Sequence, residues 1–387
     1  MRQIEQQQEK NGTNIPCFCK QTFFSGSPSI IQFSDTKNCF VRQTIYLCTK
    51  FIIVRHFNIP FFIPEEGCPH RCVFCNQRTI SGVQSAPLPN EIDRQVAAYL
   101  EMFQAIECYI EIAFFGGNFT GLPIKEQEAY LKAAQKWVTS KHVKGIRLST
   151  RPDYINSEVL KMLRSYGVSS IELGAQSLDE EVLSLCGRGH SPKHIEAAAG
   201  MILDGGFVLG LQMMTGLPGD TPEKTMFTAR RIAELGATQT RIYPALVIRG
   251  TQLEHLFRIG SYQPLTIDET INRCKQLLLF FEANSVKVLR LGLHPSDGLS
   301  QSKEMVAGPF HPALRELANT AIWGDIFRES VKNKKGKNLL VAVSPKELNA
   351  AIGHKGANKK WLLEQFDKVV FKADLQYTGR SFHVDFS

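Results

Sequence analysis

Long apolar runs are absent from this 387-residue sequence. The best candidate, residues 45–54, is short, contains Lys50 and cannot span a bilayer. The N-terminus also lacks the charged, apolar and small-residue segments of a signal peptide. We therefore expect a cytoplasmic protein with no membrane partner. In such a reducing compartment, the ten cysteines are expected to bind metal rather than to form a disulfide framework.

Residues 1–57 lack any sustained hydrophobic period, so this segment does not have the pattern of a folded domain. Its four cysteines do not have metal-ligand spacing. We expect the segment to be disordered, or to be missing from the native protein because translation starts later, for instance at Val54. An N-terminal peptide from the native host that begins at Met1 would refute the late start.

A compact cysteine loop follows the apolar residues 59–63. Cys68, Cys72 and Cys75 have C-x3-C-x2-C spacing, which lets three thiolates converge on one metal centre from a single loop. A structural zinc ion would need a fourth ligand, and His70 is too near Cys68 to supply it. Three thiolates on a four-iron cluster would instead leave one iron open for chemistry. A three-ligand zinc loop and incidental cysteines are the alternatives.

Short apolar segments alternate with predicted helices from residue 58 onwards, and capping residues mark helix starts near Asn90, Ser191, Thr221 and Thr266. The predicted strands are residues 59–63, 109–115, 145–150, 169–173, 207–214, 240–243 and 286–291. This alternation of strands and helices predicts an α/β fold in which a parallel sheet with helical crossovers forms a partial (β/α) TIM-type barrel over residues 58–300. In such a barrel, chemistry gathers where the strands end.

Polar residues stand at several predicted strand ends. Arg151, Gln176 and Ser177 are candidates for catalytic contacts with cofactor or substrate, and hydrogen bonding within the barrel is the structural alternative for each. A Gly-Gly-Asn turn at residues 116–118 follows the second predicted strand, where two glycines would let the backbone approach a ligand closely.

The cysteine loop, with an aromatic residue before its last cysteine, resembles the radical S-adenosylmethionine superfamily. In that family the open iron binds the methionyl amino and carboxylate groups, and an electron from the cluster yields a 5′-deoxyadenosyl radical. The resemblance implies an electron donor of the flavodoxin or ferredoxin type. It implies these sites: Cys68, Cys72 and Cys75 for a 4Fe-4S cluster, and Phe74, Gly116, Gly117 and Asn118 for S-adenosylmethionine. Asn118 departs from the family's Gly-Gly-Glu pattern, because it offers a neutral carbonyl in place of a charge.

Residues 149–155, 185–190, 213–219 and 241–251 narrow the resemblance to the catalytic subunit of the Elongator complex. That family modifies wobble uridine in tRNA with a radical barrel and an acetyltransferase domain. The similarity covers roughly residues 58–295 and does not reach the acetyltransferase domain, so the acetyl-CoA chemistry is not carried over. The chain also resembles proteins labelled oxygen-independent coproporphyrinogen III oxidase-like.

The extension at residues 301–387 ends in a basic segment, since residues 331–387 hold eleven Lys and Arg against five Asp and Glu. Predicted strands at 338–343 and 368–371 flank predicted helices at 345–351 and 358–366. Together with the Gly-His-Lys-Gly turn between the helices, this order resembles a small α+β KH-like domain, whose glycine turn clamps a nucleic-acid backbone. The candidate RNA-binding residues are Gly353, Lys355, Gly356, Lys359 and Lys360. A plain helix–helix turn is the alternative.

These observations predict a radical enzyme that acts on tRNA or another RNA. One alternative is an oxidase of a small, porphyrin-like molecule, for which the basic segment would be irrelevant. Another is a non-catalytic RNA-binding protein with a structural cluster. The sequence does not predict the oligomeric state.

Overall fold

The computed structural model describes residues 55–64, 67–68, 71–83, 85–103, 108–293, 304–334 and 336–387. The expectations for residues 1–54 lie outside this set. Residues 55–57 are described and form the start of the first strand, which begins at Arg55 rather than at residue 59 as predicted. No helix in the described ranges is long and apolar enough to cross a membrane.

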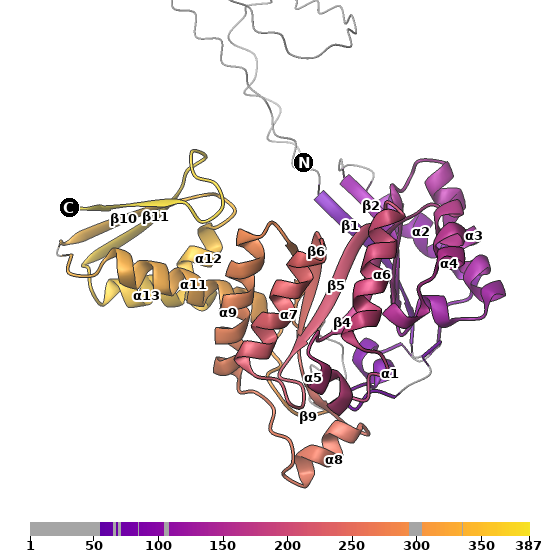
Figure 1. The fold of residues 1–387 in the computed structure, drawn as a ribbon. Coiled ribbons are helices and arrows are strands. Elements are labelled where there is room, and N and C mark those ends of the chain that lie inside the picture. The colour runs from indigo at the N-terminus through magenta and orange to yellow at the C-terminus, as the bar shows by residue number, and fades with distance from the viewer. Residues whose placement is uncertain are drawn as a thin grey trace, which may run out of the picture. The chain divides into compact units, whose positions relative to one another are not determined.

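Seven parallel strands in the described part of the chain form one sheet, in the order β1-β2-β3-β4-β5-β6-β8. The strands are β1 (Arg55–Ile63), β2 (Cys108–Gly116), β3 (Gly145–Thr150), β4 (Val168–Gln176), β5 (Val208–Thr215), β6 (Gln239–Pro244) and β8 (Lys287–Leu291). Helices connect and flank them (Figure 1). The predicted fold class, an α/β partial TIM-type barrel, is confirmed.

The barrel helices are α1 (Gln77–Ser81), α2 (Pro89–Phe103), α3 (Ile124–Thr139), α4 (Ser157–Ser165), α5 (Glu180–Leu185), α6 (Pro192–Asp204), α7 (Pro222–Glu234), α8 (Gln252–Arg258) and α9 (Ile267–Ala283). Local sequence sets several starts. Thr221 caps α7 by accepting a hydrogen bond from the Lys224 amide, and Thr266 forms a capping box with Glu269 at the head of α9. Both starts match the prediction.

The predicted end of the fourth strand is wrong. Residues 169–173 were expected to be strand and residues 174–177 loop, whereas β4 continues to Gln176. The register with β5 shifts between Gly174 and Gln176, and Gln176 has a φ of +66°. A bulge of this kind lets a strand continue through residues whose sequence resembles a turn.

The C-terminal region has its own small sheet, with the order β11-β10-β12. Its strands are β10 (Asn338–Val343), β11 (Lys368–Ala373) and β12 (Phe382–Phe386), and its helices are α11 (Leu314–Ser330), α12 (Leu348–Ile352) and α13 (Ala357–Leu363). Trp323 and Phe327 of α11 are fully buried in the core of this region. The sequence reading missed α11 and β12.

A two-residue strand β7 (Val247–Ile248) pairs with β9 (Met305–Ala307) near the barrel.

Candidate active site

The carboxyl ends of β1, β2 and β3 lie side by side, because Ile63 pairs with Gly116 and Phe114 pairs with Leu148 in the parallel ladders. The cysteine loop leaves the end of β1, and the Gly-Gly-Asn turn leaves the end of β2. The sheet therefore brings together the two segments for which cofactor contacts were predicted.

Asn118 connects three parts of this edge. Its carboxamide nitrogen donates to the carbonyl of Gly67 at 2.7 Å, and its carboxamide oxygen accepts from Thr150 Oγ1 at 2.6 Å and from the Arg151 amide at 3.2 Å. The side chain is 2% exposed. Its donor and acceptor atoms thus hold the start of the cysteine loop against the end of β3. Sequence reasoning gave Asn118 a cofactor role and missed this connection.

Two glycines at the same edge are required by close backbone approach. A Cβ atom on Gly116, at φ +127°, would lie 2.2 Å from the Ile63 carbonyl oxygen. A Cβ atom on Gly67, at φ +74°, would lie 2.5 Å from the carbonyl oxygen of Asn118. Gly117 donates its amide to the Ile63 carbonyl at 3.2 Å. The turn is packed directly on the first strand, and no larger residue fits there.

The three loop cysteines form no disulfide bond within the described part of the chain; Cys72 is buried, while Cys68 and Cys75 are partly buried. The Cys75 amide donates to the Cys72 carbonyl at 3.0 Å, which folds the loop tightly. Phe74 is 9% exposed and packs in an apolar cluster with Cys72 and other residues around the loop. Val73 anchors that cluster through its amide, which donates to the Cys186 carbonyl at 3.1 Å.

Arg188 makes a polar contact with the loop and was not among the predicted site residues. Its guanidinium donates to Cys72 Sγ at 3.2 Å, to the Gly174 carbonyl, and to His190 Nε2 at 3.1 Å. Since Nε2 of His190 accepts, the ring proton belongs on Nδ1. That atom is buried and has no hydrogen-bond partner in the described part of the chain. Burial, then the charges of Arg188 and Arg151, lower the pKa of His190 to about 3, so the ring is neutral at pH 7.

Arg151 is almost fully buried, and its guanidinium binds the Asp153 carboxylate through two hydrogen bonds of 2.9 Å. It also donates to the Arg188 carbonyl at 2.8 Å. Its Nη1 atom is buried without a partner among the residues that the structure describes. Buried donors of this kind normally have a partner, so Arg151 and His190 leave two donors for a ligand at this edge.

Gln176 and Ser177 make structural contacts. Gln176 Oε1 accepts from Gln212 Nε2 at 3.0 Å. Ser177 Oγ lies 3.3 Å from Thr228 Oγ1 on α7 and accepts from the Asp179 amide at 3.1 Å. For both residues these contacts fit the structural alternative better than a role in binding a ligand.

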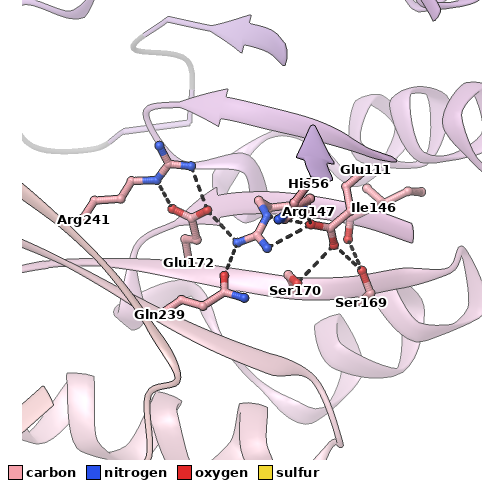
Figure 2. Close-up of polar contacts among 9 residues, drawn as sticks. All are labelled: His56, Glu111, Ile146, Arg147, Ser169, Ser170, Glu172, Gln239 and Arg241. Atoms are coloured by element: carbon pink, nitrogen blue, oxygen red, sulfur yellow. Dashed lines mark hydrogen bonds and ion pairs between the residues drawn. The ribbon is translucent and has the colours of Figure 1, made fainter. Parts of the chain in front are cut away.

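A buried charge network connects side chains of β1, β2, β3, β4 and β6 (Figure 2). Arg147 donates to Glu111 at 2.9 Å and to Glu172 at 2.9 Å, and Glu172 also pairs with Arg241. His56 Nε2 lies 2.7 Å from Glu111 Oε2. Although burial alone would raise it, hydrogen bonding to His56 and the Arg147 charge lower the pKa of Glu111 to about 2. The signal that sequence reasoning missed was a charged residue inside each of several apolar strands.

The basic residues predicted for RNA binding lie around the turn between α12 and α13. Lys355, Lys359 and Lys360 are exposed. Gly353, at φ +88°, is packed so closely that a Cβ atom would lie 2.9 Å from the Asn358 amide nitrogen. Gly356 is also left-handed, at φ +74°, with open space beside it. The structure therefore places one exposed lysine, Lys355, in the glycine turn and two, Lys359 and Lys360, in α13 directly after it.

The chain belongs to the radical SAM superfamily. The Radical SAM superfamily profile matches residues 62–232, and the profile of the Radical_SAM C-terminal domain matches residues 237–322. The chain is therefore an enzyme that depends on a 4Fe-4S cluster and S-adenosylmethionine. Its similarity to Elongator-like members, expected from the sequence, is also confirmed.

An uncharacterized protein of Methanocaldococcus jannaschii is 30% identical over 247 residues, which cover 59% of this chain and 72% of the relative. A tRNA uridine(34) acetyltransferase of Methanocaldococcus infernus is 26% identical over 246 residues, which cover 53% of this chain and 46% of the relative. This chain thus spans about half the length of that acetyltransferase. The structure of the archaeal Elp3 of Methanocaldococcus infernus, with an N-terminal deletion, has a TM-score of 0.54 at 20% identity and covers 72% of this chain and 63% of that one.

The donor set fits an iron–sulfur cluster. Three cysteines lie in one loop, and thiolate sulfur is the ligand that iron–sulfur clusters use. Among the described residues, no three Cys, His, Asp or Glu side chains are grouped closely enough for a single metal ion. The three thiolates of a cluster site can lie farther apart than the ligands of a single metal ion, because each thiolate binds a different iron at a separate corner of the cluster.

Proposed function

We propose that this radical SAM enzyme modifies tRNA or another RNA. The observation that carries the proposal is the similarity to a tRNA uridine(34) acetyltransferase across 246 residues. The exposed lysines in the glycine turn of the C-terminal region and in the helix after it support it, since basic side chains beside a G-x-x-G turn suit a nucleic-acid backbone. We place the protein in the cytoplasm, with a flavodoxin or ferredoxin as electron donor.

In this proposal Cys68, Cys72 and Cys75 hold the cluster. When bound, the cluster supplies the electron that cleaves S-adenosylmethionine to a 5′-deoxyadenosyl radical. Arg188 holds the Cys72 sulfur in place through a hydrogen bond from its charged guanidinium. Phe74 gives the loop an apolar side that excludes water.

The turn at Gly116, Gly117 and Asn118 seats S-adenosylmethionine through its backbone, since the Asn118 side chain is already used to hold the cysteine loop. The free donors of Arg151 and His190 are suited to an anionic group, such as the carboxylate of S-adenosylmethionine. These two donors are fixed by Asp153 and Arg188 before any ligand arrives.

The first test is anaerobic reconstitution with iron and sulfide, followed by reduction with S-adenosylmethionine and measurement of 5′-deoxyadenosine. We expect the wild type to form the product, Cys72→Ala to form none, and the matched control Cys108→Ala to retain activity, because Cys108 lies in β2 outside the loop. Product from Cys72→Ala at the wild-type rate would refute the assignment of the cluster ligands.

The second test concerns the substrate class. Full-length enzyme should bind tRNA in a salt-sensitive manner, and Lys355→Glu with Lys359→Glu should weaken binding at least tenfold, since each phosphate contact adds to the salt-dependent affinity. The control is Lys132→Glu with Lys161→Glu, which changes the same charge on exposed residues of α3 and α4. Equal loss in both double variants, or no RNA binding at all, would overturn the RNA proposal and favour a small-molecule substrate.

A further inference from the structure

A cavity of about 710 Å³ lies away from the cysteine loop, on the amino-terminal side of the main sheet. It is bounded by the edge strands β1 and β8, the end of α9, and α11 with later residues of the C-terminal region. The volume lies within the range of about 300–1,000 Å³ that is usual for small-molecule sites. Neither the family match nor the proposed RNA contacts assign a role to it.

The walls of the cavity carry more positive than negative charge. The cations are Arg241, Lys287, Arg290, Arg315 and Arg380, and the carboxylates are Glu282 and Glu347. Arg380 binds both carboxylates, at 2.9 and 3.3 Å. Arg241 is paired with Glu172 inside the barrel, as Figure 2 shows. Three cations therefore remain without a carboxylate partner in the described structure.

The contacts of these three cations leave donors free. Arg290 donates to the carbonyls of Gly292 and Leu293, and Arg315 donates through Nη1 to the Val288 carbonyl at 2.8 Å. Within the described ranges, the Lys287 ammonium has no hydrogen-bond or ion-pair partner. Partial desolvation, followed by the charge of Arg380, lowers the pKa of Arg315. An anion in the cavity would relieve this repulsion.

The neutral carboxamide of Asn58 in the same cavity adds a second requirement for the ligand. Asn58 Oδ1 is buried and lacks a hydrogen-bond partner among the described residues. An acceptor in this position calls for a donor on the ligand, such as a sugar hydroxyl. A ligand that combines a phosphate with a ribose satisfies both the free cations and this oxygen.

We propose that this cavity binds the phosphate group of a nucleotide, either free or at the 5′ end of an RNA strand. Free arginine and lysine donors are the groups that proteins use to bind phosphate. If the cavity binds a free nucleotide, the proposal is independent of RNA modification. If the phosphate belongs to an RNA strand, the proposal rests on the proposed function.

The test is calorimetric titration of the cluster-loaded, full-length enzyme with inorganic pyrophosphate, with ADP, and with a short RNA that either carries or lacks a 5′-phosphate. S-adenosylmethionine is kept saturating, so that the adenosine of ADP cannot occupy the cofactor site. Binding of ADP identifies a free nucleotide, whereas binding of only the 5′-phosphorylated RNA identifies an RNA end.

Lys287→Gln combined with Arg315→Gln should weaken binding of the phosphorylated probe by roughly tenfold or more, the loss expected for charged hydrogen bonds. Lys287→Gln alone removes no side-chain contact with the described residues, so its smaller loss, about threefold to tenfold, is not explained by misfolding. The control Lys132→Gln with Lys161→Gln removes two exposed charges from the barrel helices α3 and α4. No binding of any phosphorylated probe at millimolar concentration, or equal affinity in the cavity variants and the wild type, would overturn the proposal.

The same variants separate this site from the proposed function. Formation of 5′-deoxyadenosine should be unchanged in Lys287→Gln, because the cavity does not include the cysteine loop. If phosphate binding fails while 5′-deoxyadenosine forms and the lysines of the glycine turn still bind tRNA, the cavity proposal alone is wrong.

Discussion

Arg188 Nη1 lies 3.2 Å from Cys72 Sγ, although the two residues are 116 positions apart in the sequence. The guanidinium is fixed on its other side by the Gly174 carbonyl and by His190. Hydrogen bonds to cluster sulfurs are among the factors that set reduction potential, because they stabilise the more negative, reduced state. Arg188 is thus a positioning residue for the proposed cluster.

Arg188→Gln should lower the reduction potential of the reconstituted cluster. A shift of roughly 60 mV corresponds to a tenfold change for a one-electron couple, and is of the size expected for one charged hydrogen bond. The measurement is a redox titration followed by electron paramagnetic resonance, with Arg188→Lys as the conservative variant and Lys161→Gln as the surface control. An unchanged potential in Arg188→Gln would show that the contact is only structural.

Asn118→Ala should destabilise the protein and loosen the cysteine loop. The change removes hydrogen bonds to Gly67, Thr150 and Arg151 at a buried position, and unsatisfied buried partners cost about 1–3 kcal/mol each. We expect a loss of about 2–4 kcal/mol in the free energy of unfolding, measured by denaturant titration. Asn349→Ala, at an exposed site on α12, is the control and should be close to neutral.

Arg147→Met should be among the most damaging changes in the barrel, since it leaves Glu111 and Glu172 buried near each other with less compensation. Breaking a buried pair in this way costs about 3–5 kcal/mol. Adding Glu111→Gln should restore part of the loss, because it removes one of the two uncompensated charges. A double variant that is less stable than Arg147→Met would contradict this account.

The network also predicts a pH dependence. The pKa of Glu111 is about 2 in the folded protein, below its ordinary value of 4.5. The carboxylate therefore contributes stability above about pH 4.5, and this contribution is lost as the pH falls towards 2. Comparison of wild type with Glu111→Gln by denaturation should show a stability difference on the order of 3 kcal/mol at pH 7 that shrinks below pH 4.5. A constant difference across this range would exclude the mechanism.

Sequence reasoning succeeded where the determinants are local. The capping box of Thr266 and Glu269 fixes the start of α9 with four adjacent residues. The cysteine spacing is equally local, so the family and its cofactors could be identified from ten residues. It failed for the end of β4, because a register shift against β5 allows Gly174–Gln176 to pair as strand.

The contacts of the site were beyond prediction for a related reason. Arg188 meets Cys72, and Asn118 meets Gly67, only after parallel strands have been placed side by side. The charges within β2, β3, β4 and β6 are visible in the sequence, but their pairing depends on which strands become neighbours. The hydrophobic period and the composition of a strand indicate which of its side chains are buried. They do not indicate which strands become neighbours in the sheet.

The network from His56 to Arg241 also fills part of the barrel interior. Its central residue, Arg147, is 1% exposed, and its carboxylate partners are buried with it across the barrel interior (Figure 2). His56 and Arg241 also line the basic cavity, so we expect the network to separate that cavity from the cysteine loop. We therefore expect the substrate to reach the loop from the side of the barrel where the strands end.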